Sequence, residues 1–122
     1  MRLYLRCLGM SADVPVRGHL DVMLLAVLQA GPAHGYAIIE QLRARSGGMF
    51  ALPEGTVYPA LHRLEQEGLL SSRWAQVSGR RRRVYEITRR GRAELGTRRR
   101  GWGEFAAAVN NVLEGAPWAT TI

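Results

Sequence analysis

The chemistry that this sequence offers is concentrated in arginine side chains. All 17 basic residues are arginine and 10 residues are acidic, which gives a net charge of +7. Eight of these arginines lie within residues 73–92, where Glu86 is the one acidic residue, so this segment carries the whole net charge. Guanidinium groups present a fixed fork of donors that matches phosphate oxygens. The clustering therefore predicts a local contact with a polyanion.

Four consecutive arginines follow the turn sequence at residues 78–79: Arg80, Arg81, Arg82 and Arg83. Side chains alternate between the two faces of a strand, so about half of the four can reach one duplex surface at the same time. We expect about two phosphate contacts from this hairpin, with insertion into the minor groove where A·T tracts narrow it. The alternative is that these arginines are solvated charges that protect a sheet edge.

A second group of candidate contact residues lies on a helix predicted to end at Glu67. Apolar residues at positions 57, 60, 61 and 64 have helical spacing and are assigned to the core. A rotation of 100° per residue then places these residues on the opposite face: Gly55, Tyr58, Pro59, His62, Arg63 and Gln66. Their polar groups can meet phosphates or base edges in a major groove about 12 Å wide. A solvated helix face is the alternative, and the neighbouring arginines favour DNA.

The start of this helix is open between two residues. Pro59 has no amide hydrogen and is best tolerated in the first helical turn, which favours Thr56 as the N-cap. Glu54 and Gly55 would then form the approach to the helix. A helix that begins at Glu54 is the alternative.

Catalysis has little support in the sequence. The three histidines lack metal-ligand spacing, and no serine is paired with a base. Glu65 and Glu67 are two residues apart, so a helix would place them on different faces. A phosphate-binding loop motif is absent. We therefore expect no enzyme activity, no cofactor and no metal.

At 122 residues the chain has room for one compact domain and an accessory helix. Apolar runs stay below the roughly 18 residues that span a bilayer, so we expect neither a signal peptide nor a membrane anchor. Cys7 is the single cysteine, which rules out an internal disulfide and is consistent with a cytoplasmic protein. We expect Cys7 to be an inert thiol, with redox sensing as the alternative.

Hydrophobic periodicity predicts the elements that position these residues. One helix covers the apolar stripe from about Leu20 and ends at Gly31-Pro32; a second runs from about residue 34 to residues 46–48. Residues 49–52 are expected to form a short strand. Residues 70–77 and 82–88 are expected to form two strands joined by a tight turn. The predicted fold is α+β, mostly helical with a small β-hairpin: a winged helix-turn-helix followed by a C-terminal helix.

The final helix is expected to begin after Thr88 as its N-cap and to end at residues 115–117. Its apolar stripe consists of Leu95, Trp102, Phe105, Ala106, Val109 and Leu113. Three glycines weaken this helix by about 1 kcal/mol each relative to alanine, so it needs a packing partner. The arginines at residues 98–100 are expected to form its solvated face.

Five motifs in this order resemble the PadR family of bacterial transcriptional regulators. They are RGHLD at 17–21, GPAHGYAI at 31–38, EGTVYPALHRLE at 54–65, GLL at 68–70 and RRVYEITRRG at 82–91. The resemblance covers residues 17–114. One departure is Pro53, which stands where the family commonly has a helix-capping serine.

The resemblance implies roles for individual residues. Thr56, Tyr58 and Pro59 match the recognition-helix motif, with Tyr58 as the foremost DNA contact, and the hairpin arginines match the basic wing. Tyr36 matches a tyrosine of the second helix that either packs or contacts the DNA backbone. Trp102 matches an interface tryptophan of the subgroup with a short C-terminal helix. There it would stack a planar aromatic ligand, together with the face at 105, 106 and 109, or pack the dimer core.

These inferences predict a cytoplasmic, homodimeric repressor that binds double-stranded DNA at a pseudo-palindromic operator and is relieved by a small-molecule effector. The expected divisions are an N-terminal tail that is disordered without a partner (1–17), the winged DNA-binding domain (18–88), the dimerisation helix (89–115) and a short tail (116–122). The alternatives are an RNA-binding module and a protein adaptor that docks an acidic partner through the same basic hairpin.

Overall fold

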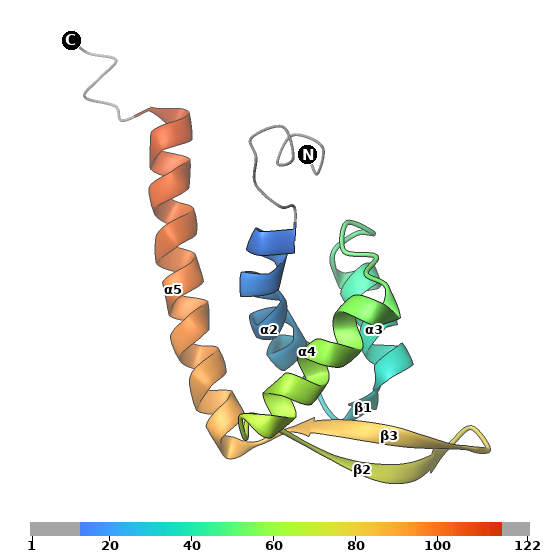
Figure 1. The fold of residues 1–122 in the computed structure, drawn as a ribbon. Helices are drawn as coiled ribbons and strands as arrows, with labels where there is room; N and C mark the ends of the chain where they lie inside the picture. Colours follow the sequence, from blue (N-terminus) through green and yellow to red (C-terminus); the bar gives the residue numbers. More distant parts are fainter. Residues whose placement is uncertain (1–12, 116–122) are drawn as a thin grey trace.

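A computed structural model describes residues 13–115, with side chains from His19 onward. These residues form a winged helix-turn-helix with a long final helix (Figure 1). The elements in chain order are α2 (Asp13–Gln29), β1 (Ala33–His34), α3 (Gly35–Arg45), α4 (Glu54–Gln66), β2 (Leu70–Val77), β3 (Arg80–Ile87) and α5 (Arg89–Glu114). The α+β fold class predicted from the sequence is confirmed. Cys7 and the segments 1–12 and 116–122 lie outside the described residues.

Helix α2 begins at Asp13, seven residues before the predicted start at Leu20. Residues 13–17, which were expected in the tail, are therefore helical. Pro15 lies in the first turn of α2, where no amide hydrogen is needed. The helix ends where the sequence predicted, just before Gly31.

The core forms around α2. One apolar stripe of each neighbouring helix and the inner face of the sheet pack against it. Its most deeply buried members are Leu24, Leu25, Leu28, Ile38, Val57, Leu61, Leu64, Leu70, Tyr85 and Leu95. Residues 57, 60, 61 and 64 of α4 are all buried, as their spacing predicted. The opposite face of α4 is consequently turned away from the core.

The sheet is antiparallel with strand order β1-β3-β2, and β2 and β3 form the predicted hairpin. Ser78 and Gly79 at its tip have φ angles of 53° and 78°. Two left-handed residues make the kind of two-residue turn that matches the right-handed twist of the strands. β3 begins at Arg80, directly after the turn, so the predicted start at residue 82 was two residues late.

The third strand lies at a different place from the one expected. Residues 46–50 form a turn and residues 51–53 have no regular structure, so the strand expected at 49–52 is wrong. Gly47 and Gly48, with φ angles of 64° and 88°, turn the chain there. The strand is instead β1, in which Ala33 pairs with Tyr85 of β3. Two residues are too few to show a strand period, which is why the sequence did not reveal it.

Helix α4 begins at Glu54, so the preferred start with Thr56 as the N-cap was wrong. The amide groups of Thr56 and Val57 both donate to the carbonyl of Pro53, at 3.0 and 3.2 Å, and Pro53 is the N-cap without a side-chain bond. Pro59 consequently lies inside the helix, where it leaves the carbonyl of Gly55 without its usual donor. Both Gly55 and Pro59 are exposed, so water can satisfy that carbonyl.

Helix α5 begins as predicted. The Thr88 hydroxyl accepts a hydrogen bond from the amide of Gly91 at 3.0 Å and donates to the carbonyl of Gly68 at 2.8 Å. The first half of α5 runs beside α2, and its second half extends beyond the rest of the described fold (Figure 1). Within residues 13–115, none of the helices combines the length and the hydropathy that crossing a bilayer requires.

Candidate nucleic-acid interface

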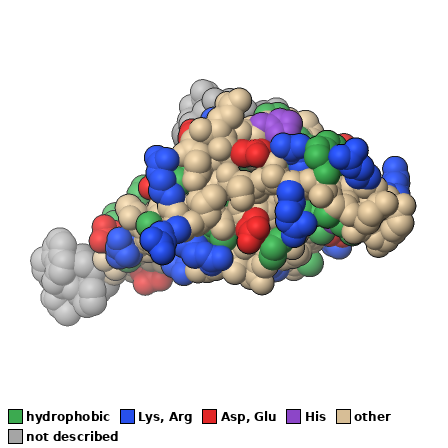
Figure 2. All heavy atoms as spheres, turned by 90° about the horizontal axis from the view of Figure 1, so that it is seen from below, with side chains coloured by type: hydrophobic (Ala, Val, Ile, Leu, Met, Phe, Trp, Pro, Cys, Tyr) green, Lys and Arg blue, Asp and Glu red, His purple; other side chains and the backbone are tan. Residues whose placement is uncertain are grey.

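The face that carries the hairpin is rich in arginine. Figure 2 shows this face from below, with arginine side chains recurring across it and a few acidic side chains between them. The strand register separates the hairpin arginines into two sets, because Trp74 is paired with Arg83 and Ala75 with Arg82. Arg81 and Arg83 share the face of Trp74, while Arg80 and Arg82 lie on the other face.

Trp74 lies beside the two arginines of its own face. The guanidinium carbons of Arg81 and Arg83 are 5.0 and 5.4 Å from the centroid of its ring system, which is cation–π distance. Trp74 is 53% exposed. It was not among the predicted site residues, although its place opposite Arg83 in the hairpin was available as a signal. The indole holds both side chains along the strand and limits their rotation.

Arg83 is also linked to α4, through Ser72 of β2. Its Nε donates to the hydroxyl of Ser72 at 2.9 Å, and that hydroxyl donates to Glu65 of α4 at 2.6 Å. One of its terminal nitrogens is 3.8 Å from the same Glu65 carboxylate. This chain of contacts ties the hairpin to α4 and uses part of the donor capacity of Arg83.

Arg82 lies half-buried on the other face of the hairpin. Its Nε is buried and has no hydrogen-bond partner among the described residues. Burial and the charge of Arg82 lower the pKa of His34 below its ordinary value of 6.5. The neutral His34 ring caps α3, since its Nδ1 accepts from the amide of Ala37 at 3.4 Å. Arg80 and Arg81 remain exposed, and among the described residues neither makes an ion pair.

The outer face of α4 is only partly as predicted. Pro59, His62 and Gln66 are exposed, whereas Thr56 and Tyr58 are half-buried. The Tyr58 ring packs against Gly35 at the start of α3. The Tyr58 side chain therefore packs at the edge of the core and is also partly accessible at the surface.

Tyr36 projects from the first turn of α3. Its side chain is 56% exposed, which places it outside the core. Its ring is nearly parallel to that of His34, at 8°, with the centroids 6.5 Å apart. Of the two roles that the sequence left open for Tyr36, this position is compatible with contact to a DNA backbone.

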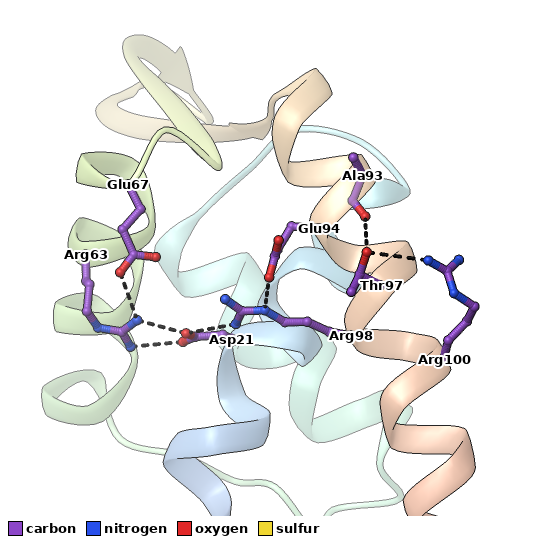
Figure 3. Close-up of polar contacts among 8 residues, drawn as sticks. All are labelled: Asp21, Arg63, Glu67, Ala93, Glu94, Thr97, Arg98 and Arg100. Carbon is purple, nitrogen blue, oxygen red and sulfur yellow. Dashed lines mark hydrogen bonds and ion pairs between the residues drawn. The ribbon is translucent and has the colours of Figure 1, made fainter.

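Arg63 does not point outward with its neighbours on α4. Its two terminal nitrogens donate to the Asp21 carboxylate of α2 at 2.8 and 2.9 Å, and Glu67 lies 3.9 Å away (Figure 3). The hydrogen bond to Asp21 raises the pKa of the Arg63 guanidinium. The rotation of 100° per residue fixes where the Cβ points, but the long arginine side chain bends back to a buried carboxylate.

Arg98 of α5 reaches the same carboxylate, at 3.3 Å, and donates through Nε to Glu94 at 2.7 Å (Figure 3). Arg98 was expected on the solvated face of α5, so this expectation was wrong. Asp21 is 7% exposed and is the buried acidic residue that draws both arginines inward. The sequence marked Asp21 only as the last residue of the RGHLD motif, and nothing in it indicated that two arginines would meet this carboxylate.

The outer half of α5 carries an exposed apolar face. Trp102, Phe105 and Val109 are exposed, Ala106 is half-buried, and Val112 and Leu113 continue the face toward the helix end. The Trp102 ring meets the ring of His19 on α2 edge-on, with centroids 4.7 Å apart. In the described part of the chain, no three His, Cys, Asp or Glu side chains gather to hold a metal ion.

Comparison with known proteins identifies the family. The model of the PadR-like family of transcriptional regulators matches residues 24–97, which include α3, α4 and the whole hairpin. The chain belongs to the PadR-like family. A transcriptional regulator of Mycobacterium tuberculosis is 46% identical over 76 residues, covering 62% of this chain and 68% of that protein.

Solved structures of PadR proteins share the fold. The crystal structure of a PadR family transcription regulator from Clostridium difficile is 33% identical, with a TM-score of 0.70, and the match covers 78% of this chain and 98% of that chain. A PadR family regulator from Eggerthella lenta is 31% identical, with a TM-score of 0.71 and coverage of 82% and 86%.

Membership of the PadR-like family makes the chain a transcriptional regulator and not an enzyme. It implies DNA binding, and therefore favours duplex DNA over the RNA-binding and protein-adaptor alternatives. The arginine hairpin and the exposed residues of α4 are the described groups for which the sequence predicted such a contact.

Proposed function

We propose that this PadR protein is a homodimeric repressor. It binds a pseudo-palindromic operator on chromosomal DNA in the cytoplasm and leaves the operator when a planar aromatic effector binds. The observation that carries the proposal is the exposed apolar face of α5. This face lies at the opposite end of the fold from the arginine hairpin, so a second copy could cover it while the hairpin stays free.

Pairing through α5 would bury that face. Large apolar groups at 102, 105, 109, 112 and 113 are exposed together, which is unusual on a helix that has no partner. An apolar groove of about 310 Å³ lies between α2 and α3, lined by residues such as Met23, Val27, Leu42 and Phe50. In a two-fold dimer, the α5 end of each copy would fill the groove of the other.

The DNA contacts divide between the two motifs. Arg80 and Arg81 would approach phosphates or the minor groove, and the exposed parts of α4 would enter the major groove. Residues proposed for the major groove are Thr56, Tyr58, Pro59 and His62, with Tyr36 at the adjacent backbone. We assign Arg63, Arg82 and Arg83 to holding these elements in place, because each is partly buried or bonded within the protein. Two copies would place their α4 helices about 34 Å apart on successive major grooves.

The effector site would lie at the dimer interface. Trp102 from each copy could stack on opposite sides of a flat aromatic molecule, and such stacking adds roughly 0.5–1.5 kcal/mol to apolar burial. The effector would relieve repression to the extent that it prefers a dimer whose α4 helices are misplaced for DNA. If Trp102 only packs the interface, the dimer would still repress but would not respond to such a ligand.

The test combines solution mass with DNA binding. Light scattering after gel filtration should give a dimer, and a fluorescent duplex from the region upstream of the gene should bind more tightly than a scrambled duplex. Structured RNA should compete poorly, and a reporter behind that upstream region should be repressed. A protein that stays monomeric at micromolar concentration, or that ignores every duplex at low salt, would contradict the proposal.

A further inference from the structure

Asp21 is the buried acidic residue on which two arginines of the fold converge (Figure 3). Arg63 donates to both of its carboxylate oxygens, and Arg98 donates to Oδ2 at 3.3 Å. A buried carboxylate is costly unless charged donors compensate it. Both arginines are therefore held where they are by the need to satisfy this one group.

The two arginines come from helices with different proposed roles. Arg63 belongs to α4, which faces DNA, and Arg98 belongs to α5, which carries the dimer and effector face. The carboxylate between them belongs to α2, which contacts both helices. A bidentate guanidinium–carboxylate pair fixes orientation as well as distance, so α4 cannot turn about its axis without breaking it.

The α5 side of this link lies close to the exposed apolar face. Arg98 precedes Trp102 by four residues, which is about one helical turn. Trp102 in turn touches His19, two residues before Asp21 on α2. A change in the surroundings of Trp102 therefore acts on the same turns of α5 and α2 that hold Arg98 and Asp21.

We propose that Asp21 is a positioning residue for DNA binding, through which the placement of α5 sets the placement of α4. This inference rests on the proposed function of α4 as the DNA-contacting helix. It assigns the regulatory path to a defined set of contacts, Arg98–Asp21–Arg63. A purely structural role for Asp21 would stabilise the fold without making operator affinity depend on Arg98.

The experiment is a double-mutant cycle on operator affinity. Anisotropy of a labelled duplex is measured for wild type, Arg98→Gln, Asp21→Asn and the double variant, with the dimer fraction checked for each. We expect Arg98→Gln to weaken specific binding by about tenfold in the wild-type background and by less than about twofold when Asp21 is already Asn. Arg98→Lys, which keeps a charged donor, should recover most of the affinity.

Arg100→Gln is the matched control. It removes the same charge from the same helix, but the Arg100 guanidinium contacts Thr97, at 3.5 Å, and not Asp21. Its effect should be small and equal in both backgrounds. Equal losses for Arg98→Gln with and without Asp21, or a loss no greater than that of Arg100→Gln, would overturn the inference.

A second measurement separates this inference from the proposed function. Hydrogen exchange of the α4 amides should become faster in Arg98→Gln, although the substitution is on α5, while exchange in α3 stays unchanged. Unchanged α4 exchange would overturn the link even if the protein binds its operator. Faster α4 exchange in a protein that binds no duplex would instead overturn the proposed function and leave the link intact.

Discussion

The ring of Tyr58 lies directly against the Cα of Gly35, where the start of α3 meets α4. A Cβ at position 35 would overlap the Cε1, Cζ and hydroxyl oxygen of that ring. The requirement at Gly35 is for space, since its backbone is helical. The two helices of the helix-turn-helix therefore approach as closely as they do because one of them begins with glycine.

Gly35→Ala should destabilise the fold by about 1–3 kcal/mol, because the added methyl group must displace the Tyr58 ring or separate α3 from α4. Urea unfolding followed by circular dichroism measures the change. Gly55→Ala on α4 is the control: a methyl group at that position would have no neighbouring atom within 4 Å, so the substitution should be neutral or stabilising. A Gly35→Ala protein as stable as wild type would show that the close approach has no energetic consequence.

Replacing Arg80 and Arg81 by alanine should weaken binding to all duplexes and make its dependence on salt less steep. Each lost phosphate contact lowers the slope of log affinity against log salt by about 0.9. Arg80 and Arg81 lie on opposite faces of the hairpin, so one lost contact and a change of roughly 0.9 are expected. Arg83→Ala should change the slope less, because that side chain is already bonded to Ser72 and close to Glu65. Arg43→Ala on α3 is the control. A slope equal to that of wild type in the Arg80 and Arg81 variant would show that the hairpin does not contact DNA.

His34 should make stability depend on pH. Its pKa is lowered in the folded protein by burial and by Arg82, so below its ordinary value of 6.5 the unfolded chain binds more protons than the folded one. The contribution is therefore fully present above pH 6.5 and is lost as the pH falls through that value toward the folded pKa. Unfolding midpoints between about pH 7.5 and pH 5.5 should fall for wild type.

His34→Asn should remove that part of the pH dependence while keeping a side chain that can cap α3. The measurement is the difference between the two proteins across the same pH range. Identical pH profiles for wild type and His34→Asn would mean that another group titrates.

Leu113→Glu should shift the chain from dimer to monomer, because a carboxylate on the exposed apolar face of α5 cannot be buried against a second copy at low cost. Sedimentation at micromolar concentration gives the mass, and operator affinity should fall with it because each copy then binds one half-site. Ala107→Glu introduces the same charge on the opposite side of the helix and should leave the mass unchanged. Equal masses for the two variants would place the interface elsewhere.

Much of the fold could be predicted because its signals are periodic. The stripe of Leu61 and Leu64 identified α4, Ser78 and Gly79 identified the hairpin turn, and Thr88 identified the start of α5. The strand at Ala33 and His34 could not be found, because two residues derive their strand conformation from pairing with β3 and not from their own pattern.

The site was harder to predict, because side-chain reach is not periodic. Arg63 lies on a helix face predicted to contact DNA and Arg98 on one predicted to be solvated, yet both guanidinium groups turn to Asp21. Helical geometry fixes the direction of a Cβ atom. A guanidinium group has five N–H donors on a long, flexible stem, so its acceptor can be any group within reach in the folded structure. The turn at Ser78 and Gly79 could have placed Trp74 opposite Arg83, but strand pairing alone does not show that the Arg81 guanidinium carbon lies 5.0 Å from the centroid of the Trp74 ring.

The hairpin presents its exposed positive charge as guanidinium groups, and the chain contains no lysine. Guanidinium groups keep their proton throughout the range of acidity found in cells, and lysine acetylation, which neutralises other basic surfaces, has no side-chain amine to modify here. The positive charge of this hairpin, and with it the attraction to a phosphate backbone, therefore stays the same when the pH of the cell changes and when lysine acetylation increases. Neither deprotonation nor lysine acetylation can remove these charges. Release of the protein from its target therefore requires a change in the position of the arginines.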